Sequence, residues 1–188
     1  MFLALSGSLF GTLASAADCK AIRAEYEGKT LYLQYNLWNH DGEAKWVNFM
    51  REGDFVDLGT PVLVKKLKSD SAVLQVVGQK RQVELDLEDV LPDCGTVLSR
   101  MLGSSAPSLE RLSDKDRDGI KRGALSVGMS RRAIFMAVGY PPYRYEKPFS
   151  NQTANNHDVT ANELTYAGST FDLVVVKFEN DIATSIDD

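Results

Sequence analysis

The feature that most constrains this chain is its single pair of cysteines, Cys19 and Cys94. An even cysteine count in an exported chain is typical of a disulfide framework, because oxidising compartments keep such bridges formed. A Cys19–Cys94 bridge would close a loop of roughly 75 residues and would stabilise the fold by about 4 kcal/mol in the chain-entropy model. We therefore expect a disulfide that brackets one structural unit.

The first residues indicate that the chain is exported. Residues 1–16 carry no charged side chain and end in Ala14-Ser15-Ala16, a pattern typical of signal-peptide cleavage. We expect a signal peptide cut after Ala16, and the alternative is a buried N-terminal helix. The apolar run is shorter than the roughly 20 residues that a membrane-spanning helix needs. We therefore expect no transmembrane span in the mature chain.

Lipid attachment at Cys19 is a second way to hold such a chain at a membrane. Lipoprotein signals place a small residue directly before the modified cysteine, whereas Asp18 stands at that position here. We expect a soluble exported protein, periplasmic or associated with the outer membrane, without a lipid anchor. The formal net charge is −5 and there is no long basic run. Nucleic acid is not an expected partner, because phosphate neutralisation requires clustered lysine and arginine.

Between the cysteines, short alternating segments predict strands. Residues 30–38 place alternate apolar side chains on one face, which predicts a single half-buried strand. The Asp41-Gly42 turn that follows predicts that residues 45–49 pair with it. Further strands are predicted at residues 61–67, 72–77 and 82–87. Several short strands with tight turns predict a small antiparallel barrel over residues 17–94.

Residues 95–112 contain the run GSSAPS and predict a linker. Ser113 can then cap a helix that runs to about Arg122. The run DKDRDG at residues 114–119 also matches the first half of a calcium loop, but Leu125 stands where the bidentate glutamate is needed. We therefore expect a capped helix start here rather than a metal site.

The segment VGMSRRAIFMAVGYPP, residues 127–142, predicts a short helix with a signal at each end. Ser130 can cap its start, and Gly139 followed by two prolines ends it. The apolar stripe predicts a buried face, with Arg131 and Arg132 facing solvent. Such a short helix must pack on something. Strands predicted at residues 164–167, 170–178 and 182–186 supply a sheet, and the polar residues 147–162 predict a loop.

These C-terminal segments resemble the SmpA/OmlA domain, the family of the outer-membrane assembly lipoprotein BamE. The similarity covers about residues 118–188 and rests on Gly128, Met129, Ser130, Gly139, Pro141, Tyr166, Val176 and Phe178. Residues 53–77 resemble a bacterial SH3-like barrel. Together the resemblances imply an α+β chain. Its parts would be a small antiparallel SH3-like β-barrel at residues 17–94, a linker at 95–112, and a BamE-like domain of two helices and three antiparallel strands at 113–188.

The sequence shows no motif that carries enzyme chemistry. The G-x-S-x-G, H-E-x-x-H, P-loop and dinucleotide patterns are absent. His40 and His157 lie in polar, turn-like stretches, and the carboxylates show no pairing typical of an acid and a base. We therefore expect no catalytic residue, no cofactor, no metal and no enzymatic activity.

The strongest binding candidates are aromatic. Tyr140, Tyr143 and Tyr145 follow the short helix beside Arg144, and tyrosine and arginine are favoured at protein interfaces. These four residues form a candidate interaction surface, and the alternative is that the tyrosines pack on the sheet.

The family resemblance implies a protein-interaction module. We expect a non-catalytic exported protein that binds an unidentified envelope protein and acts as a scaffold in outer-membrane assembly or maintenance. One alternative is an SH3-like module that binds peptidoglycan or a peptide. The other is a secreted enzyme inhibitor, because the BamE-like fold resembles that of β-lactamase inhibitory proteins.

Overall fold

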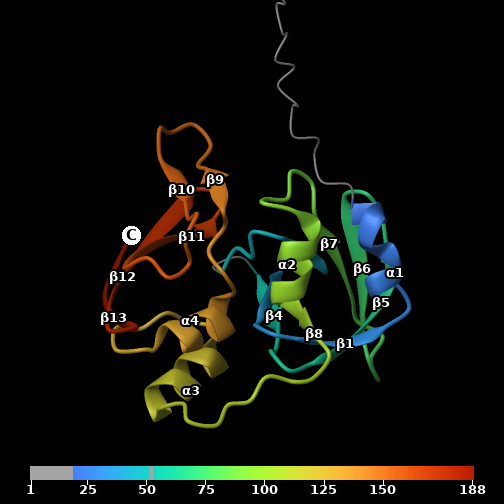
Figure 1. The fold of residues 1–188 in the computed structure, drawn as a ribbon, viewed down its shortest axis with the longest axis horizontal. Helices are drawn as coiled ribbons and strands as arrows, with labels where there is room; N and C mark the ends of the chain where they lie inside the picture. Colours follow the sequence, from blue (N-terminus) through green and yellow to red (C-terminus); the bar gives the residue numbers. More distant parts are fainter. Residues whose placement is uncertain (1–18, 51–52) are drawn as a thin grey trace, which may run out of the picture.

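A computed structural model describes residues 19–50 and 53–188. The predicted signal peptide lies outside the described residues. The chain forms two lobes that lie side by side (Figure 1). We call residues 19–50 and 53–103 the barrel lobe and residues 113–188 the C-terminal lobe. The described part of the chain has no helix that is both long and apolar enough to cross a membrane.

The barrel lobe is built on one six-stranded sheet with the order β3-β7-β6-β5-β1-β8. Neighbouring strands are antiparallel except β3 and β7, which are parallel. Side chains alternate between the two faces of the sheet, and only one face packs against the core. In β6, for example, every second residue is buried. The strands are β1 (Thr30–Leu33), β3 (Glu43–Lys45), β5 (Pro61–Leu67), β6 (Ser71–Val76), β7 (Gln82–Asp86) and β8 (Leu102–Gly103), with a separate pair formed by β2 (Leu37–Asn39) and β4 (Asp54–Val56).

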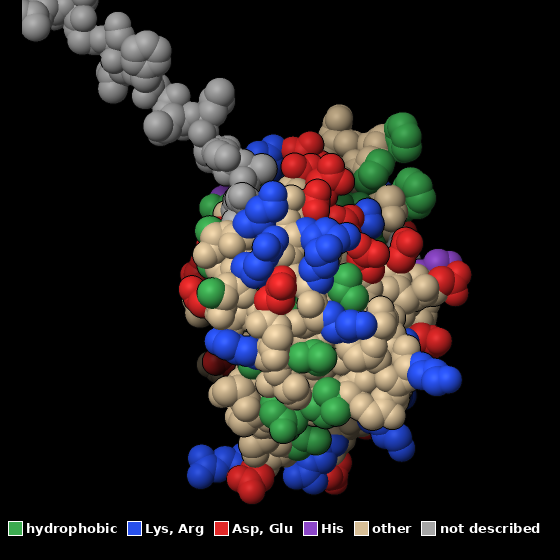
Figure 2. All heavy atoms as spheres, turned by 90° about the vertical axis from the view of Figure 1, so that its right-hand side faces the viewer, with side chains coloured by type: hydrophobic (Ala, Val, Ile, Leu, Met, Phe, Trp, Pro, Cys, Tyr) green, Lys and Arg blue, Asp and Glu red, His purple; other side chains and the backbone are tan. Residues whose placement is uncertain are grey.

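The outer side of the barrel lobe carries a group of cations. Figure 2 shows lysine and arginine side chains gathered over the upper part of the face that is turned away from the C-terminal lobe. Strand β5 contributes two consecutive exposed cations, Lys65 and Lys66.

Three helical segments close the barrel lobe: η1 (Cys19–Ile22), α1 (Arg23–Tyr26) and α2 (Cys94–Met101). The disulfide between Cys19 and Cys94 joins η1 to the start of α2, so the bridge predicted from the sequence is confirmed. Asp93 caps α2, since its carboxylate accepts a hydrogen bond from the Thr96 backbone N–H at 2.8 Å. This bond and the Thr96 hydroxyl hold the pKa of the Asp93 carboxyl below its usual range.

The C-terminal lobe contains α3 (Asp114–Arg122), α4 (Arg131–Val138), a hairpin of β9 (Arg144–Glu146) with β10 (Thr153–Asn155), and the sheet β11-β12-β13. The sheet strands are β11 (Glu163–Ser169), β12 (Asp172–Glu179) and β13 (Ile182–Asp187). Ser113 caps α3 with a capping box and Ser130 caps α4, as predicted. The apolar side of α4 packs with Val174, Val176 and Phe178 of β12 in one buried cluster.

Asn36 joins the barrel lobe to both helices of the C-terminal lobe. Its side-chain Nδ2 donates hydrogen bonds to the backbone carbonyls of Ile120, at 2.7 Å, and of Ala137, at 3.1 Å. Its Oδ1 accepts the backbone N–H of Leu58 at 2.9 Å. The residue is only 1% exposed, so water does not replace these partners.

Asn48 continues this junction. Its Nδ2 donates to the carbonyls of Asn36, at 3.1 Å, and of Val138, at 2.7 Å, while its Oδ1 accepts the backbone N–H of Trp38 at 2.8 Å. Gly139 lets the end of α4 come this close, because a Cβ there would stand 2.9 Å from the Asn48 Nδ2. The two asparagines therefore form one connected buried network.

Apolar packing extends across the same junction. Met50 is buried within the cluster of the C-terminal lobe. Val47 and Phe49 are buried together with Ala167 of β11 in a third cluster. The two lobes therefore share core residues and do not have wholly separate hydrophobic cores.

The predicted fold class, an SH3-like barrel followed by a BamE-like two-helix domain, is wrong. The described residues are mostly β, with 37% in strands and 20% in helices, and they form four short α-helices and several sheets that include a six-stranded half-barrel. One reason is that β8, from the predicted linker, pairs with β1 and extends the barrel sheet. Another is that the tyrosine-rich segment and the predicted polar loop pair as β9 and β10.

The single strand predicted over residues 30–38 is also wrong. Strand β1 ends at Leu33 and β2 begins at Leu37. The chain turns between the two strands, and the Asn36 amide in this turn donates hydrogen bonds to carbonyls of α3 and α4. Residues 45–49 do not pair with this segment. Instead, β3 pairs in parallel with β7, whose sequence lies about forty residues further on.

Arg131 does not face solvent as predicted. It is 7% exposed, and its guanidinium lies 4.0 Å above the Phe178 ring. It is 2.7 Å from the Asp181 carboxylate and also donates to the carbonyls of Val159 and Ala161. A buried charge is stable only with such partners, and here they fix part of the segment predicted to be a loop.

Replacing Asn36 with alanine tests the junction. The Asn36→Ala variant leaves the Ala137 carbonyl and the Leu58 N–H without partners and removes one of the two donors of the Ile120 carbonyl. The free energy of unfolding should therefore fall by about 3 kcal/mol in equilibrium urea denaturation. The matched control is Asn151→Ala at an exposed site, which should change it by less than about 0.5 kcal/mol. Equal effects of the two substitutions would contradict this role.

Removing the disulfide tests the stabilisation by loop closure. The bridge spans 75 residues, so Cys19→Ser/Cys94→Ser should lower the free energy of unfolding by about 4 kcal/mol. Reductant should shift the urea midpoint of the unsubstituted protein and leave that of the variant unchanged. An unshifted midpoint, with both thiols shown free by labelling, would rule out the predicted stabilisation.

Candidate functional site

A groove runs along the boundary between the two lobes. One part, about 580 Å³, lies over β3, the end of β7 and the start of β6. The second part, about 590 Å³, lies between the barrel lobe and the β9 hairpin. The two parts share Lys45, Phe49, Asp86 and Glu88 and are therefore continuous. We call them together the inter-lobe groove.

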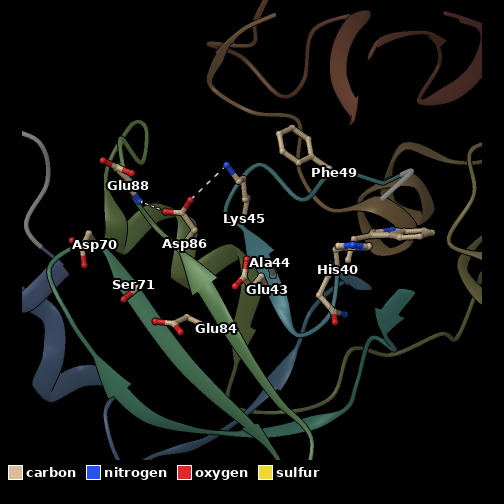
Figure 3. Close-up of a pocket in the computed structure, with 12 residues that line it drawn as sticks. His40, Glu43, Ala44, Lys45, Phe49, Asp70, Ser71, Glu84, Asp86 and Glu88 are labelled. Atoms are coloured by element: carbon tan, nitrogen blue, oxygen red, sulfur yellow. Dashed lines mark hydrogen bonds and ion pairs between the residues drawn. The ribbon is translucent and has the colours of Figure 1, made fainter. Parts of the chain in front are cut away.

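Carboxylates dominate the barrel-lobe side of this groove (Figure 3). Glu43 on β3 is in register with Glu84 on β7, and Lys45 is in register with Asp86. The Lys45 ammonium lies 3.7 Å from Asp86, and Lys68 lies 3.1 Å from Glu84. The other carboxylates that line the groove are Asp70, Glu88, Asp89 and Glu146. The groove is therefore negatively charged even after these ion pairs are counted.

The register of Glu43 and Glu84 is unfavourable for the sheet itself. Neighbouring strands lie about 4.8 Å apart, so the two carboxylates stand side by side on one face. Like charges directly opposite each other destabilise a sheet. Among the described residues Glu43 has no ion-pair partner, and Lys68 pairs with Glu84 alone. The fold therefore gives Glu84 a partner, whereas no cation among the described residues pairs with Glu43.

Aromatic side chains line the second part of the groove. The rings of Phe49 and Tyr145 meet edge to face with centroids 5.5 Å apart. The Tyr145 hydroxyl donates to the Thr170 carbonyl at 2.9 Å, which ties the β9 hairpin to the turn between β11 and β12. Trp46 lies beside them and its indole N–H donates to the Glu88 carbonyl at 3.1 Å. These contacts hold the rings in place beside the acidic strand face.

Two of the four residues predicted as an interaction surface line this groove. Arg144 and Tyr145 both contribute to its second part. Arg144 is exposed and forms an ion pair with Glu146 on the same strand.

The other two predicted residues lie elsewhere. Tyr140 stacks on Phe135 with ring centroids 4.4 Å apart and lines a different cleft, beside α2 and α4. Tyr143 packs edge-on against His157, with centroids 4.5 Å apart. The structure therefore does not gather the three tyrosines into one patch.

The acidic face was missed by sequence reasoning, although part of its signal was visible. The run VELDLED at residues 83–89 places Glu84, Asp86 and Glu88 at alternating positions, which puts them on one face of an extended strand. The neighbouring Glu43 gave no such signal, because its position beside Glu84 depends on a long-range strand pairing.

The described residues do not contain a group of three His, Cys, Asp or Glu side chains placed to hold a metal ion. Asp116, from the DKDRDG run, instead accepts the backbone N–H groups of Ser113, at 3.2 Å, and Ser130, at 2.7 Å. Its carboxylate therefore serves the starts of both α3 and α4.

Comparisons of the chain with protein-family models, curated proteins and solved structures find no match. The resemblances to the SmpA/OmlA and SH3-like families receive no support from these comparisons. The functional argument therefore depends on the geometry of the groove.

Neutralising Glu43 should stabilise the protein. The Glu43→Gln variant removes a like-charge contact, so the free energy of unfolding should rise by about 0.5 kcal/mol at low salt and by less at high salt. The matched control is Glu163→Gln, because Glu163 is in register with the opposite charge of Lys177. For that control, urea denaturation should show a small decrease or no change in the free energy of unfolding. Destabilisation by Glu43→Gln would contradict the repulsion.

Proposed function

We propose that the protein is a non-catalytic binding module of the cell envelope whose inter-lobe groove holds a cationic, extended segment of a partner protein. The observation that carries this proposal is the in-register pair Glu43 and Glu84 on the acidic side of the inter-lobe groove. A lysine or arginine side chain between the two carboxylates would turn their repulsion into two attractive contacts. Such a ligand gives a physical reason for a pair that weakens the sheet.

The spacing of the carboxylates favours an extended ligand. Glu84 and Asp86 stand two residues apart on β7, a repeat of about 6.7 Å along a strand, and Glu88 lies in the turn that follows. A segment in extended conformation presents alternate side chains at the same repeat. Basic side chains on one side of such a segment would meet the carboxylates, and the apolar side chains between them could contact Phe49 and Tyr145.

Export and an envelope location are part of the same proposal. The Cys19–Cys94 bridge supports an oxidising compartment such as the periplasm, and the pattern of residues 1–16 supports a signal peptide. A scaffold role in outer-membrane assembly or maintenance rests on the family resemblance. The groove favours a peptide ligand among the alternatives, whereas its negative charge disfavours polyanions.

A defined peptide tests the groove. The probe is a fluorescein-labelled decapeptide of alternating lysine and leucine, and its control is the same peptide with glutamine in place of lysine. We expect the lysine peptide to bind, with weaker binding as salt increases. The Glu43→Gln/Glu84→Gln/Glu88→Gln variant should bind about tenfold more weakly in fluorescence anisotropy, because several charge-assisted contacts are lost.

The matched control removes three exposed carboxylates outside the groove, as Glu110→Gln/Asp114→Asn/Glu179→Gln. This variant should bind the lysine peptide within about twofold of the unsubstituted protein, since distant exposed charges are screened. No binding of the lysine peptide, or equal weakening by both triple variants, would overturn the proposal.

A further inference from the structure

A second cleft, about 610 Å³, lies between α2, α4 and the segment that joins the lobes. Its lining includes three cations, Arg100 of α2 and Arg131 and Arg132 of α4. It shares no lining residue with the inter-lobe groove. We call it the arginine cleft. Its charge is opposite to that of the groove, so the two sites select different ligands.

The three arginines differ in how their charge is balanced. Arg131 is buried and is neutralised by Asp181 at 2.7 Å, so its role is structural. Arg132 is exposed, and its Nη2 donates to the backbone carbonyl of Ser108 at 2.8 Å. Arg100 lies with its guanidinium 4.9 Å above the Tyr140 ring. Within the described ranges, neither Arg100 nor Arg132 has a carboxylate partner.

An aromatic platform lies beside the guanidinium groups of Arg100 and Arg132. Phe135 and Tyr140 stack with centroids 4.4 Å apart and an interplanar angle of 25°. Both rings are only partly buried, so the platform is accessible from the cleft. Arginine and tyrosine together are the residue types most enriched where binding energy concentrates in protein interfaces.

We propose that the arginine cleft binds an acidic segment of a protein partner. Its carboxylates would accept paired N–H donors from Arg100 and Arg132, which is the strongest geometry for a guanidinium. An apolar or aromatic side chain of the segment would pack on Phe135 and Tyr140. This platform favours a polypeptide over a free anion, because an anion alone would leave the aromatic surface uncovered. The inference stands independently of the proposed role of the inter-lobe groove.

A second defined peptide tests the cleft. The probe is a fluorescein-labelled decapeptide of alternating glutamate and leucine, measured by anisotropy on the full chain. We expect binding that weakens about tenfold or more in Arg100→Gln/Arg132→Gln. The matched control is Lys65→Gln/Lys66→Gln, which removes two positive charges from exposed positions of β5 and should change binding by less than about twofold.

Competition measurements distinguish an acidic protein segment from a free phosphate or a lipid headgroup as the ligand. Inorganic phosphate and phosphatidylglycerol vesicles should fail to displace the glutamate peptide, and Arg100→Gln/Arg132→Gln should still bind the lysine peptide normally. The single variant Arg132→Gln, at an exposed position, carries the test if the double variant does not fold. Absence of binding, equal weakening by both double variants, or displacement by phosphate or vesicles would each overturn the inference.

Discussion

The structure depends on how the ends of two helices are satisfied where the lobes meet. The last carbonyls of an α-helix have no partner within the helix, and burying them unpaired is costly. Near the end of α3 and at the end of α4, the carbonyls of Ile120, Ala137 and Val138 are covered by the barrel lobe, and the amides of Asn36 and Asn48 supply their donors. The barrel lobe therefore caps the helices of its neighbour. Separation of the lobes would remove these donors from the helix ends and would expose the asparagine amides to water.

This junction explains why two clefts of opposite charge can coexist on a small protein. The arginine cleft and the second part of the inter-lobe groove are lined by residues from each lobe, so their shape requires a fixed arrangement of the lobes. The in-register Glu43 and Glu84 weaken the sheet locally. The other interactions of the fold offset this loss of stability. Functional sites are where proteins tolerate such local conflicts, because selection acts on binding as well as on stability.

Sequence reasoning succeeded where the signal is local. The caps at Ser113 and Ser130 depend on neighbouring residues, and the disulfide had one possible pairing although its cysteines lie 75 residues apart. It failed where the partner is distant. Asn36 looks like a solvent-facing position of an alternating strand, yet its partners Ile120 and Ala137 lie 84 and 101 residues away. The acidic groove was missed for the same reason. It depends on the parallel pairing of β3 with β7, and no hairpin turn in the sequence indicates that pairing.

Hydrogen exchange tests the central claim that the asparagine junction makes the two lobes one cooperative unit. The amides to compare are those of Leu74 in β6 and Val176 in β12, which are buried central positions of the two lobes. The account predicts that both exchange only by global unfolding, with opening free energies that agree within about 0.5 kcal/mol. Exchange of Val176 through a lower-energy opening that leaves Leu74 protected would show that the lobes unfold separately, and it would contradict the account.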